Sequence, residues 1–229
     1  MSKLEMLEQK TNESVREYAY RVIFENIMSL HLVPGTAISE KEISDRLSIS
    51  RTPVREAFIR LAQAGLLEIL PQRGTYISKI DTAQIAEFRF LRVTLERAVM
   101  ELACRSFPES YLKRLEACLA DQEHVLQKFD ASRFYELDNE MHCIIFSGCA
   151  KPSIWQLLQN ANINYIRARV LNVSAAQTEM QLLYEQHRLI MRSIVGHDVS
   201  AGIDIITKHV NKVIGDVDAL KKQYPEYFK

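Results

Sequence analysis

Residues 34–77 read PGTAISEKEISDRLSISRTPVREAFIRLAQAGLLEILPQRGTYI, and this stretch decides how the first part of the chain folds. Ser39 and Glu42 have the spacing of a capping box, which predicts the start of a short helix. Pro53 lies in the first turn of the next helix, where its missing N–H costs nothing, and Gly65 ends that helix. The segments LLEIL and TYIS, joined by PQRG, predict a two-stranded hairpin.

Another helix precedes this stretch, because apolar residues recur at helical spacing from Val15 to Leu30 and stop at VPG. Three helices followed by a β-hairpin make a winged helix-turn-helix. We predict this domain over residues 13–79, after a flexible N-terminal segment at residues 1–12.

The rest of the chain, residues 80–229, has helical periodicity and no convincing strand. Six or seven helices are predicted, at roughly 82–105, 108–129, 131–147, 151–172, 175–196 and 199–222. Several are long but lack a strict heptad, which favours a globular bundle over a coiled coil. The predicted fold is therefore mostly α, with a winged helix-turn-helix followed by an all-α bundle.

Composition describes an ordinary globular protein. Of 229 residues, 47% are hydrophobic and 25% are charged, and the formal net charge is zero. The four cysteines form no CxxC pair, which is typical of reduced thiols in a cytosolic protein. The N-terminus has no apolar signal segment, and no apolar run approaches the roughly 20 residues of a membrane span. We expect a cytoplasmic protein without a membrane partner.

A local basic cluster contrasts with the neutral chain. Residues 46–73 contain five arginines and two acidic residues, a local charge of +3. Arg51 and Arg55 lie four apart, to one side of the apolar stripe of their helix, where they suit phosphates and guanine edges. Arg73 and Gly74 at the hairpin tip suit an adjacent groove. The alternative is a solvated face with surface ion pairs.

The histidines divide into two groups. His31, His124 and His197 lie in turns or polar runs and are expected at the surface. The other three, with one carboxylate, lie among apolar residues on three predicted helices: Asp138, His142, His187 and His209. A single histidine of this kind is more often a satisfied core residue. Together the four converge easily in a bundle, and such a set suits zinc, nickel or another borderline divalent metal.

Residues 13–79 resemble the DNA-binding domain of the GntR superfamily of bacterial transcription regulators. The segments SRTPVREA, QAGLL and RGTYI carry the resemblance. It implies DNA contacts at Lys41, Arg51, Thr52, Arg55, Arg73 and Gly74. Lys41 stands where the family often has arginine, and it keeps the charge but lacks the bidentate guanidinium.

The second part resembles the FCD domain of the FadR subfamily. Asp138 and His142 form a D-x3-H pattern, and further histidines follow 45 and then 22 residues later. The resemblance implies a divalent metal at all four residues and a small organic acid in the same cavity. It also assigns effector binding to Arg92, in the segment EFRFLRVTLE. The alternative for Arg92 is an ordinary surface ion pair with Glu96.

Together the resemblances imply a ligand-responsive transcription regulator, which we expect to act as a repressor. It would bind a pseudo-palindromic double-stranded DNA operator as a homodimer, with a small organic acid as effector. One alternative is a metal-dependent hydrolase domain fused to a DNA-binding domain. Its nearest candidate bases, Glu140 and Glu185, lie off the metal-facing stripe. Another is a DNA-binding protein whose histidine cluster is purely structural.

Overall fold

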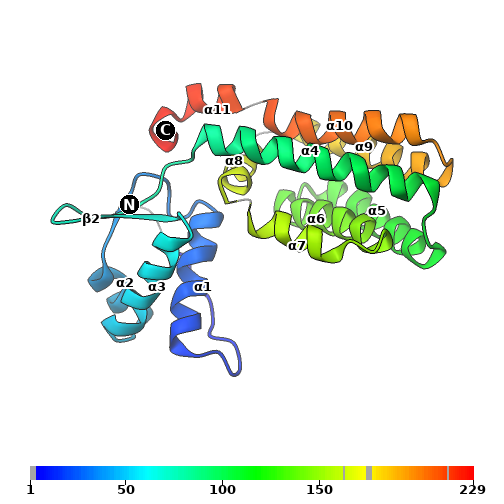
Figure 1. The fold of residues 1–229 in the computed structure, drawn as a ribbon. Helices are drawn as coiled ribbons and strands as arrows, with labels where there is room; N and C mark the ends of the chain where they lie inside the picture. The colour runs from blue at the N-terminus through cyan, green and yellow to red at the C-terminus, as the bar shows by residue number, and fades with distance from the viewer. Residues whose placement is uncertain (1–3, 162, 174–176, 216) are drawn as a thin grey trace. The chain divides into compact units, whose positions relative to one another are not determined.

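The structure is a computed structural model that describes residues 4–161, 163–173, 177–215 and 217–229. The chain forms two compact units, whose elements are labelled in Figure 1. The first comprises Met1–Thr82, Ile166–Val170 and Ala219–Lys229, and the second comprises Ala83–Tyr165 and Leu171–Asp218.

The first unit contains the predicted winged helix-turn-helix. Its helices are α1 (Val15–Met28), α2 (Glu40–Leu47) and α3 (Arg51–Gln63). The Ser39 hydroxyl accepts from the Glu42 N–H at the start of α2, as the sequence predicts. On α3 the predicted stripe of Val54, Ala57, Phe58 and Leu61 is buried, and α3 packs against both other helices. This apolar contact fixes which face of α3 remains in solvent.

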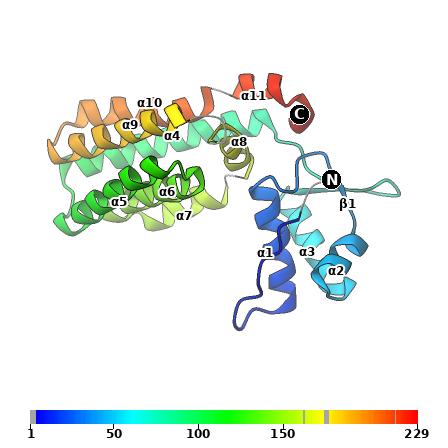
Figure 2. The same ribbon diagram turned by 180° about the vertical axis from the view of Figure 1, so that it is seen from behind.

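The wing is a three-stranded antiparallel sheet in the order β1-β3-β2. Its strands are β1 (Ala37–Ile38), β2 (Leu67–Leu70) and β3 (Gly74–Ile77). Its hairpin extends away from the helices of this unit in Figure 2. Leu70 pairs with Gly74 across the hairpin, and Gly74 adopts a φ of +110°, which favours glycine. The hairpin is as predicted, but β1 was not predicted, because two residues cannot display an alternating pattern.

Segments from both ends of the chain complete this unit. Residues 4–12 are the described part of the segment predicted to be flexible. Leu4 is buried there, and the Glu5 N–H donates to Asn26 Oδ1 on α1 at 2.6 Å. Ile80 forms a parallel bridge with Phe228 near the C-terminus. Arg167 donates from Nη1 to the Ser78 carbonyl at 2.7 Å, which ties one turn of a later helix to the end of the wing.

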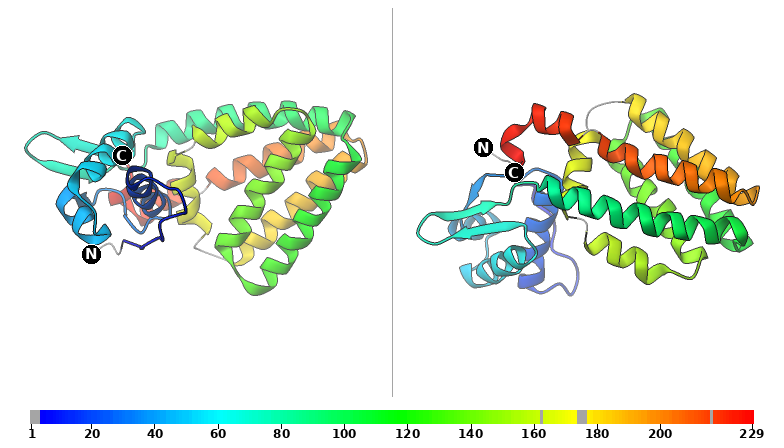
Figure 3. Two further views of the ribbon diagram at one scale, coloured as in Figure 1. Left: turned by 90° about the horizontal axis from the view of Figure 1, so that it is seen from below. Right: turned by 45° about the horizontal axis from the view of Figure 1, so that its top comes forward.

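The second unit is the predicted all-helical bundle. Within the described ranges its helices are α4 (Thr82–Arg105), α5 (Glu109–Lys128), α6 (Ala131–Gly148), α7 (Pro152–Asn160), α9 (Gln177–Val195) and α10 (Val199–Gly215). Helix α8 (Ile163–Val173) is divided, because its residues Ile166–Val170 belong to the first unit. The chain closes with α11 (Val217–Gln223) and a short 3-10 helix at Pro225–Tyr227. Helix α5 packs against α6 and α9, α9 packs against α10, and α6 packs against α7 (Figure 3).

Two predicted helices are wrong in length. The single helix predicted at 151–172 is two helices, α7 and α8, and the helix predicted at 199–222 is α10 and α11. Asparagines at 160, 162 and 164 surround the first division, and the sequence Gly-Asp at 215–216 marks the second. These residues have low helix propensity. Apolar periodicity continues on both sides of each division, so periodicity alone did not reveal them.

Helices α4 and α10 approach each other closely at Gly202. A Cβ added there would lie 2.7 Å from Cys104 Sγ and 3.0 Å from Met100 Cε. Gly202 thus lets α10 lie near enough to α4 for their side chains to share one interior. Among the described helices, none is both long and apolar enough to cross a membrane.

We expect Gly202→Ala to lower the free energy of unfolding by about 1–3 kcal/mol, because the added methyl overlaps buried side chains. Thermal or urea denaturation would measure the change. Asp204→Ala, at an exposed position of α10, is the control and should change stability by no more than about 0.5 kcal/mol. Equal stability of the Gly202 variant and the parent would show that α4 and α10 have room to separate.

Candidate metal centre

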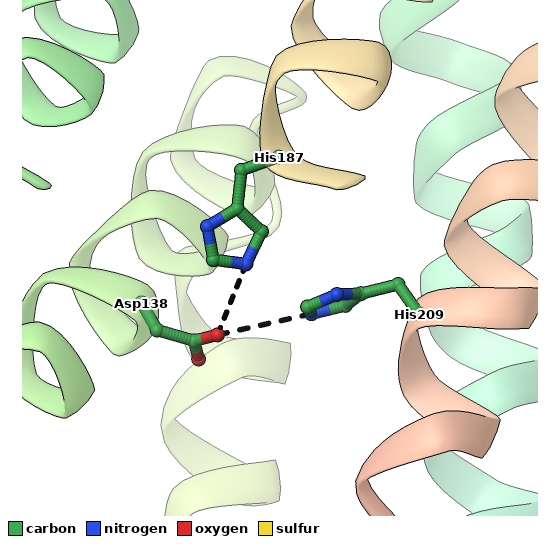
Figure 4. A group of neighbouring side chains, drawn as sticks. All are labelled: Asp138, His187 and His209. Carbon is green, nitrogen blue, oxygen red and sulfur yellow. Dashed lines mark ion pairs between the residues drawn. The ribbon is translucent and has the colours of Figure 1, made fainter. Parts of the chain in front are cut away.

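The four predicted ligands come together inside the second unit. Asp138 and His142 lie on α6, His187 on α9 and His209 on α10. All four side chains are at most 1% exposed. Figure 4 shows three of them pointing toward one another from three helices.

The distances between donor atoms are short. His187 Nε2 lies 3.1 Å from Asp138 Oδ1, and His209 Nε2 lies 3.8 Å from the same oxygen (Figure 4). One donor atom from each of these three residues lies within 4.8 Å of the others. His142 borders this group, with its Nε2 3.2 Å from His209 Nε2 and 3.8 Å from Asp138 Oδ2.

The opposite nitrogen of each ring, Nδ1, faces an oxygen atom on a neighbouring helix. The pairs are His142 with Glu96 Oε2 at 2.8 Å, His187 with Gln122 Oε1 at 2.7 Å, and His209 with Gln186 Oε1 at 3.0 Å. Three helices thus supply the orienting oxygens, namely α4, α5 and α9. With their Nδ1 atoms held in this way, the three rings present Nε2 to the shared space.

The hydrogen bonds decide which nitrogen carries the proton in two of the rings. Gln122 Nε2 donates to the Leu137 carbonyl at 3.2 Å, so Oε1 is the atom left to face His187. Nδ1 of His187 must therefore be the donor. A Glu96 carboxylate can only accept, so Nδ1 of His142 is a donor as well. In their neutral forms both rings carry the Nε2 lone pair toward the cluster.

His209 completes this pattern. Burial is the main cause that lowers its pKa well below the ordinary value, and the nearby His187 adds to the effect. A neutral ring that donates from Nδ1 to Gln186 has its lone pair on Nε2, 3.2 Å from the Nε2 of His142. Two lone pairs at hydrogen-bond distance repel each other, so this arrangement suits a cation between them.

The donor set fits a borderline divalent metal. Zinc binds imidazole nitrogen and carboxylate oxygen at about 2.0–2.2 Å, which places neighbouring donor atoms about 2.8–3.1 Å apart in octahedral geometry and about 3.3–3.6 Å apart in tetrahedral geometry. The separations of 3.1 and 3.2 Å lie within the limits of these two geometries, and the separations of 3.8 Å need only small adjustments. Imidazoles oriented by oxygen acceptors are also the usual surroundings of such a metal.

Arg92 lies beside the cluster and is 2% exposed. Its Nε donates to Glu96 Oε1, and its Nη1 donates to the Tyr165 hydroxyl at 2.7 Å. The pair with Glu96, which was the alternative to effector binding by Arg92, is therefore present, but it is buried rather than on the surface. Burial alone would raise the pKa of the Glu96 carboxyl, but the charges of Arg92 and His142 and their hydrogen bonds lower it to about 2.

Aromatic rings form a wall next to these groups. Trp155 stacks on His142, with ring centroids 5.5 Å apart and planes inclined by 16°. The Arg92 guanidinium carbon lies 5.2 Å from the Tyr165 centroid and 5.8 Å from that of Trp155. Cations are attracted to such faces, so the rings hold Arg92 in place as well as excluding water.

Several of these residues were missed in the sequence, namely Gln122, Gln186, Trp155 and Tyr165. One signal was available for Gln122. It interrupts the buried stripe of α5 between Leu119 and Leu126, and a polar residue on an apolar stripe needs a buried partner. Gln186 precedes His187 on a mostly buried face, which is a weaker form of the same signal. Nothing comparable marked the two aromatic residues.

The remaining sequence candidates are exposed. His31, His124 and His197 lie at the surface as predicted. Glu140 and Glu185, the candidate bases of a hydrolase, are also exposed and lie outside the buried cluster. In the first unit, each predicted DNA contact is exposed: Lys41, Arg51, Thr52, Arg55, Arg73 and Gly74.

Comparison with known proteins agrees with both units. Residues 16–77 match the family described as "Bacterial regulatory proteins, gntR family", and residues 87–212 match the "FCD domain". The chain is 31% identical over 216 residues to the HTH-type transcriptional repressor RspR of Escherichia coli K12, which covers 94% of each chain. It is 29% identical over 224 residues to an HTH-type regulator of Streptomyces ambofaciens, covering 96% of this chain and 92% of that one.

Solved structures share the fold. Escherichia coli McbR superposes with a TM-score of 0.71 at 18% identity, over 93% of this chain and 99% of McbR. A GntR-type regulator from Rhodococcus has a TM-score of 0.67 at 19% identity, over 87% and 97% of the two chains. The matched families and these relatives are transcription regulators, not enzymes. The chain therefore belongs to the GntR family of transcription regulators, with an FCD effector-binding domain after its winged helix-turn-helix.

Proposed function

We propose that this regulator binds a pseudo-palindromic operator as a homodimer and responds to a small carboxylate bound at a divalent metal. The observation that carries the proposal is the buried set of three oriented imidazoles and Asp138. The exposed candidate bases do not favour the alternative of a metal-dependent hydrolase. Because the Escherichia coli relative is described as a repressor, we infer the same direction of control here, in the cytoplasm where the DNA lies.

The exposed face of α3 supports DNA binding. Arg51 and Arg55 lie one helical turn apart at its start, on the exposed side next to the buried stripe. Guanidinium groups in this position suit guanine edges in the major groove. In the protein without DNA, Arg55 is held by Glu40, with Nη2 3.1 Å from Oε2, whereas no ion pair involves Arg51 within the described residues. The first contact with DNA therefore costs less at Arg51.

The second unit supports an anion site at the metal. Asp138, His142, His187 and His209 would hold the ion, and zinc and nickel both suit this set. When bound, the ion supplies positive charge and coordination positions for a carboxylate. Arg92 is linked to the metal-binding set through Glu96, whose carboxylate contacts both Arg92 and His142. Its Nη2 donates to no described group, so it is available to an anion.

The outer surface of α4 supports a dimer. Phe90 is 75% exposed there, and Leu91 and Leu102 are also exposed on this helix. A groove of about 550 Å³ adjoins Phe90, lined by Val93, Thr94 and Asn211 among others. A two-fold interface is self-complementary, so a protruding side chain next to a groove on the same surface suits a second copy of this chain.

The metal can be tested by its removal. We expect a chelator to lower the melting temperature by about 5–10 °C, because an ion present at 100 times its Kd stabilises the folded state by about 2.7 kcal/mol. Elemental analysis should find about one tightly held ion per chain. His209→Ala should lose it, whereas the exposed control His124→Ala should keep it. If the parent protein contains no metal and the chelator does not change its melting temperature, the cluster is only a polar core.

Operator binding can be tested on α3. Replacing Arg51 or Arg55 with Ala should weaken specific binding by about 1–3 kcal/mol if each contacts a base. Lys41→Ala should weaken binding to all DNA sequences by a similar factor and reduce the salt dependence of that binding, as expected for a phosphate contact. Arg114→Ala, an exposed arginine of the second unit, matches the charge change and should have little effect. Fluorescence anisotropy would measure these affinities; full operator affinity in both α3 variants would exclude base contacts there.

The dimer can be tested at Phe90. We expect Phe90→Glu to convert the dimer to a monomer at micromolar concentration, because it buries a charge against the partner. Light scattering after size-exclusion chromatography would show the change. Phe129→Glu, at a position 54% exposed in the same unit, is the control and should remain dimeric. An unchanged dimer in the Phe90 variant would place the interface elsewhere.

A further inference from the structure

The buried charges of the second unit set the charge of the ligand that it can hold. In the described part of this unit, the buried charged side chains are Arg92, Glu96 and Asp138, alongside the three imidazoles, whereas the buried Arg167 and Arg169 belong to the first unit. The imidazoles that bind a metal do so as neutral rings. One positive and two negative groups give the interior a net charge of −1.

A divalent ion changes this balance to +1. Buried net charge is costly, because the protein interior screens it far less than water does. The cost falls when a further group brings exactly one opposite charge. A second negative charge would leave the interior at −1 again, so it would gain little and require its own desolvation.

We propose that the anion bound at this metal carries a single negative charge, as a monocarboxylate does, rather than two. This inference rests on the proposed metal-assisted carboxylate site and specifies its ligand class. Hydroxyl groups on the ligand are compatible with it, since they do not alter the count. A dicarboxylate of the same length is excluded by charge and not by size.

The orienting residues keep this balance. His187 and His209 are held by the amides of Gln122 and Gln186, which carry no charge. A carboxylate at both positions would orient the rings equally well, but the metal-loaded interior would then be −1 and would repel any anion. Only His142 is oriented by a carboxylate, and that charge is offset by Arg92. Glu96 and Gln186 are therefore residues through which the net charge can be altered in either direction.

Two substitutions alter the charge by one unit without a large change of shape. Gln186→Glu lowers the metal-loaded charge to zero. Gln186 Nε2 has no hydrogen-bond partner among the described groups, so a carboxylate oxygen there loses no bond, and the other oxygen still accepts from His209. Glu96→Gln raises the charge to +2 and keeps an oxygen that can face His142. Gln181→Glu, at an exposed position of α9, is the matched control.

The experiment uses full-length protein loaded with zinc. Titration calorimetry compares monocarboxylates of about two to six carbons, with and without hydroxyl groups, with dicarboxylates of equal length. We expect at least one monocarboxylate to bind only when zinc is present, about tenfold or more tighter than its dicarboxylate. Gln186→Glu should weaken the binding of that monocarboxylate by a similar factor. Glu96→Gln should shift the preference toward the dicarboxylate, and the control should change neither.

Elemental analysis of each variant shows that the metal is retained, and melting curves show that the variant is folded. If Glu96→Gln does not fold, the comparison in the parent and in Gln186→Glu still decides. A dicarboxylate that binds in a zinc-dependent manner at least as tightly as the monocarboxylate of equal length overturns the charge inference. That result leaves the proposed function intact. Absence of zinc-dependent binding by every acid overturns both. Equal effects of Gln186→Glu and Gln181→Glu would also contradict the inference, because the change would then not act through the buried site.

Discussion

Acceptor atoms that face one another in a dry interior repel unless a proton or a metal ion lies between them. The second unit brings the Nε2 atoms of His142 and His209 to 3.2 Å, next to the Asp138 carboxylate. Five helices take part in this arrangement. Helices α6, α9 and α10 carry the donor atoms, and α4, α5 and α9 carry the oxygens that orient them. The packing of the bundle and the chemistry of its centre therefore depend on each other.

The two units use arginine in opposite ways. On α3, Arg51 is exposed, so its charge acts over a distance and is weakened by salt. In the bundle, Arg92 is buried against Glu96, Trp155 and Tyr165, where water and salt hardly reach it. Arg51 therefore suits a long, charged polymer that approaches from solution, whereas Arg92 suits a small anion bound in a site without water. A chain of zero net charge accommodates both.

Local patterns in the sequence were enough to predict much of this structure. Pro53, Gly65 and the alternation before and after the hairpin defined the winged helix-turn-helix, because each acts on its own backbone. The four clustered residues stood out because charged or polar side chains on apolar helical stripes need partners. The contacts between residues of different helices could not be predicted from the sequence. That Gln122 on α5 meets His187 on α9 depends on the register of their packing, which no single helix specifies. The short strand β1 was missed partly for the same reason, since it pairs with β3, which is distant in sequence.

The ion pair between Arg55 and Glu40 bears on how such a protein finds one site in a genome. Random DNA competes for every regulator, and its attraction is mostly electrostatic. A carboxylate beside Arg55 reduces that attraction, because any duplex must first displace it. Only a sequence that repays the displacement with a guanine contact would hold the protein for long. If Arg55 contacts DNA as proposed, Glu40 would shorten the time spent on incorrect sites, and the search for the operator would proceed faster although each encounter is weaker.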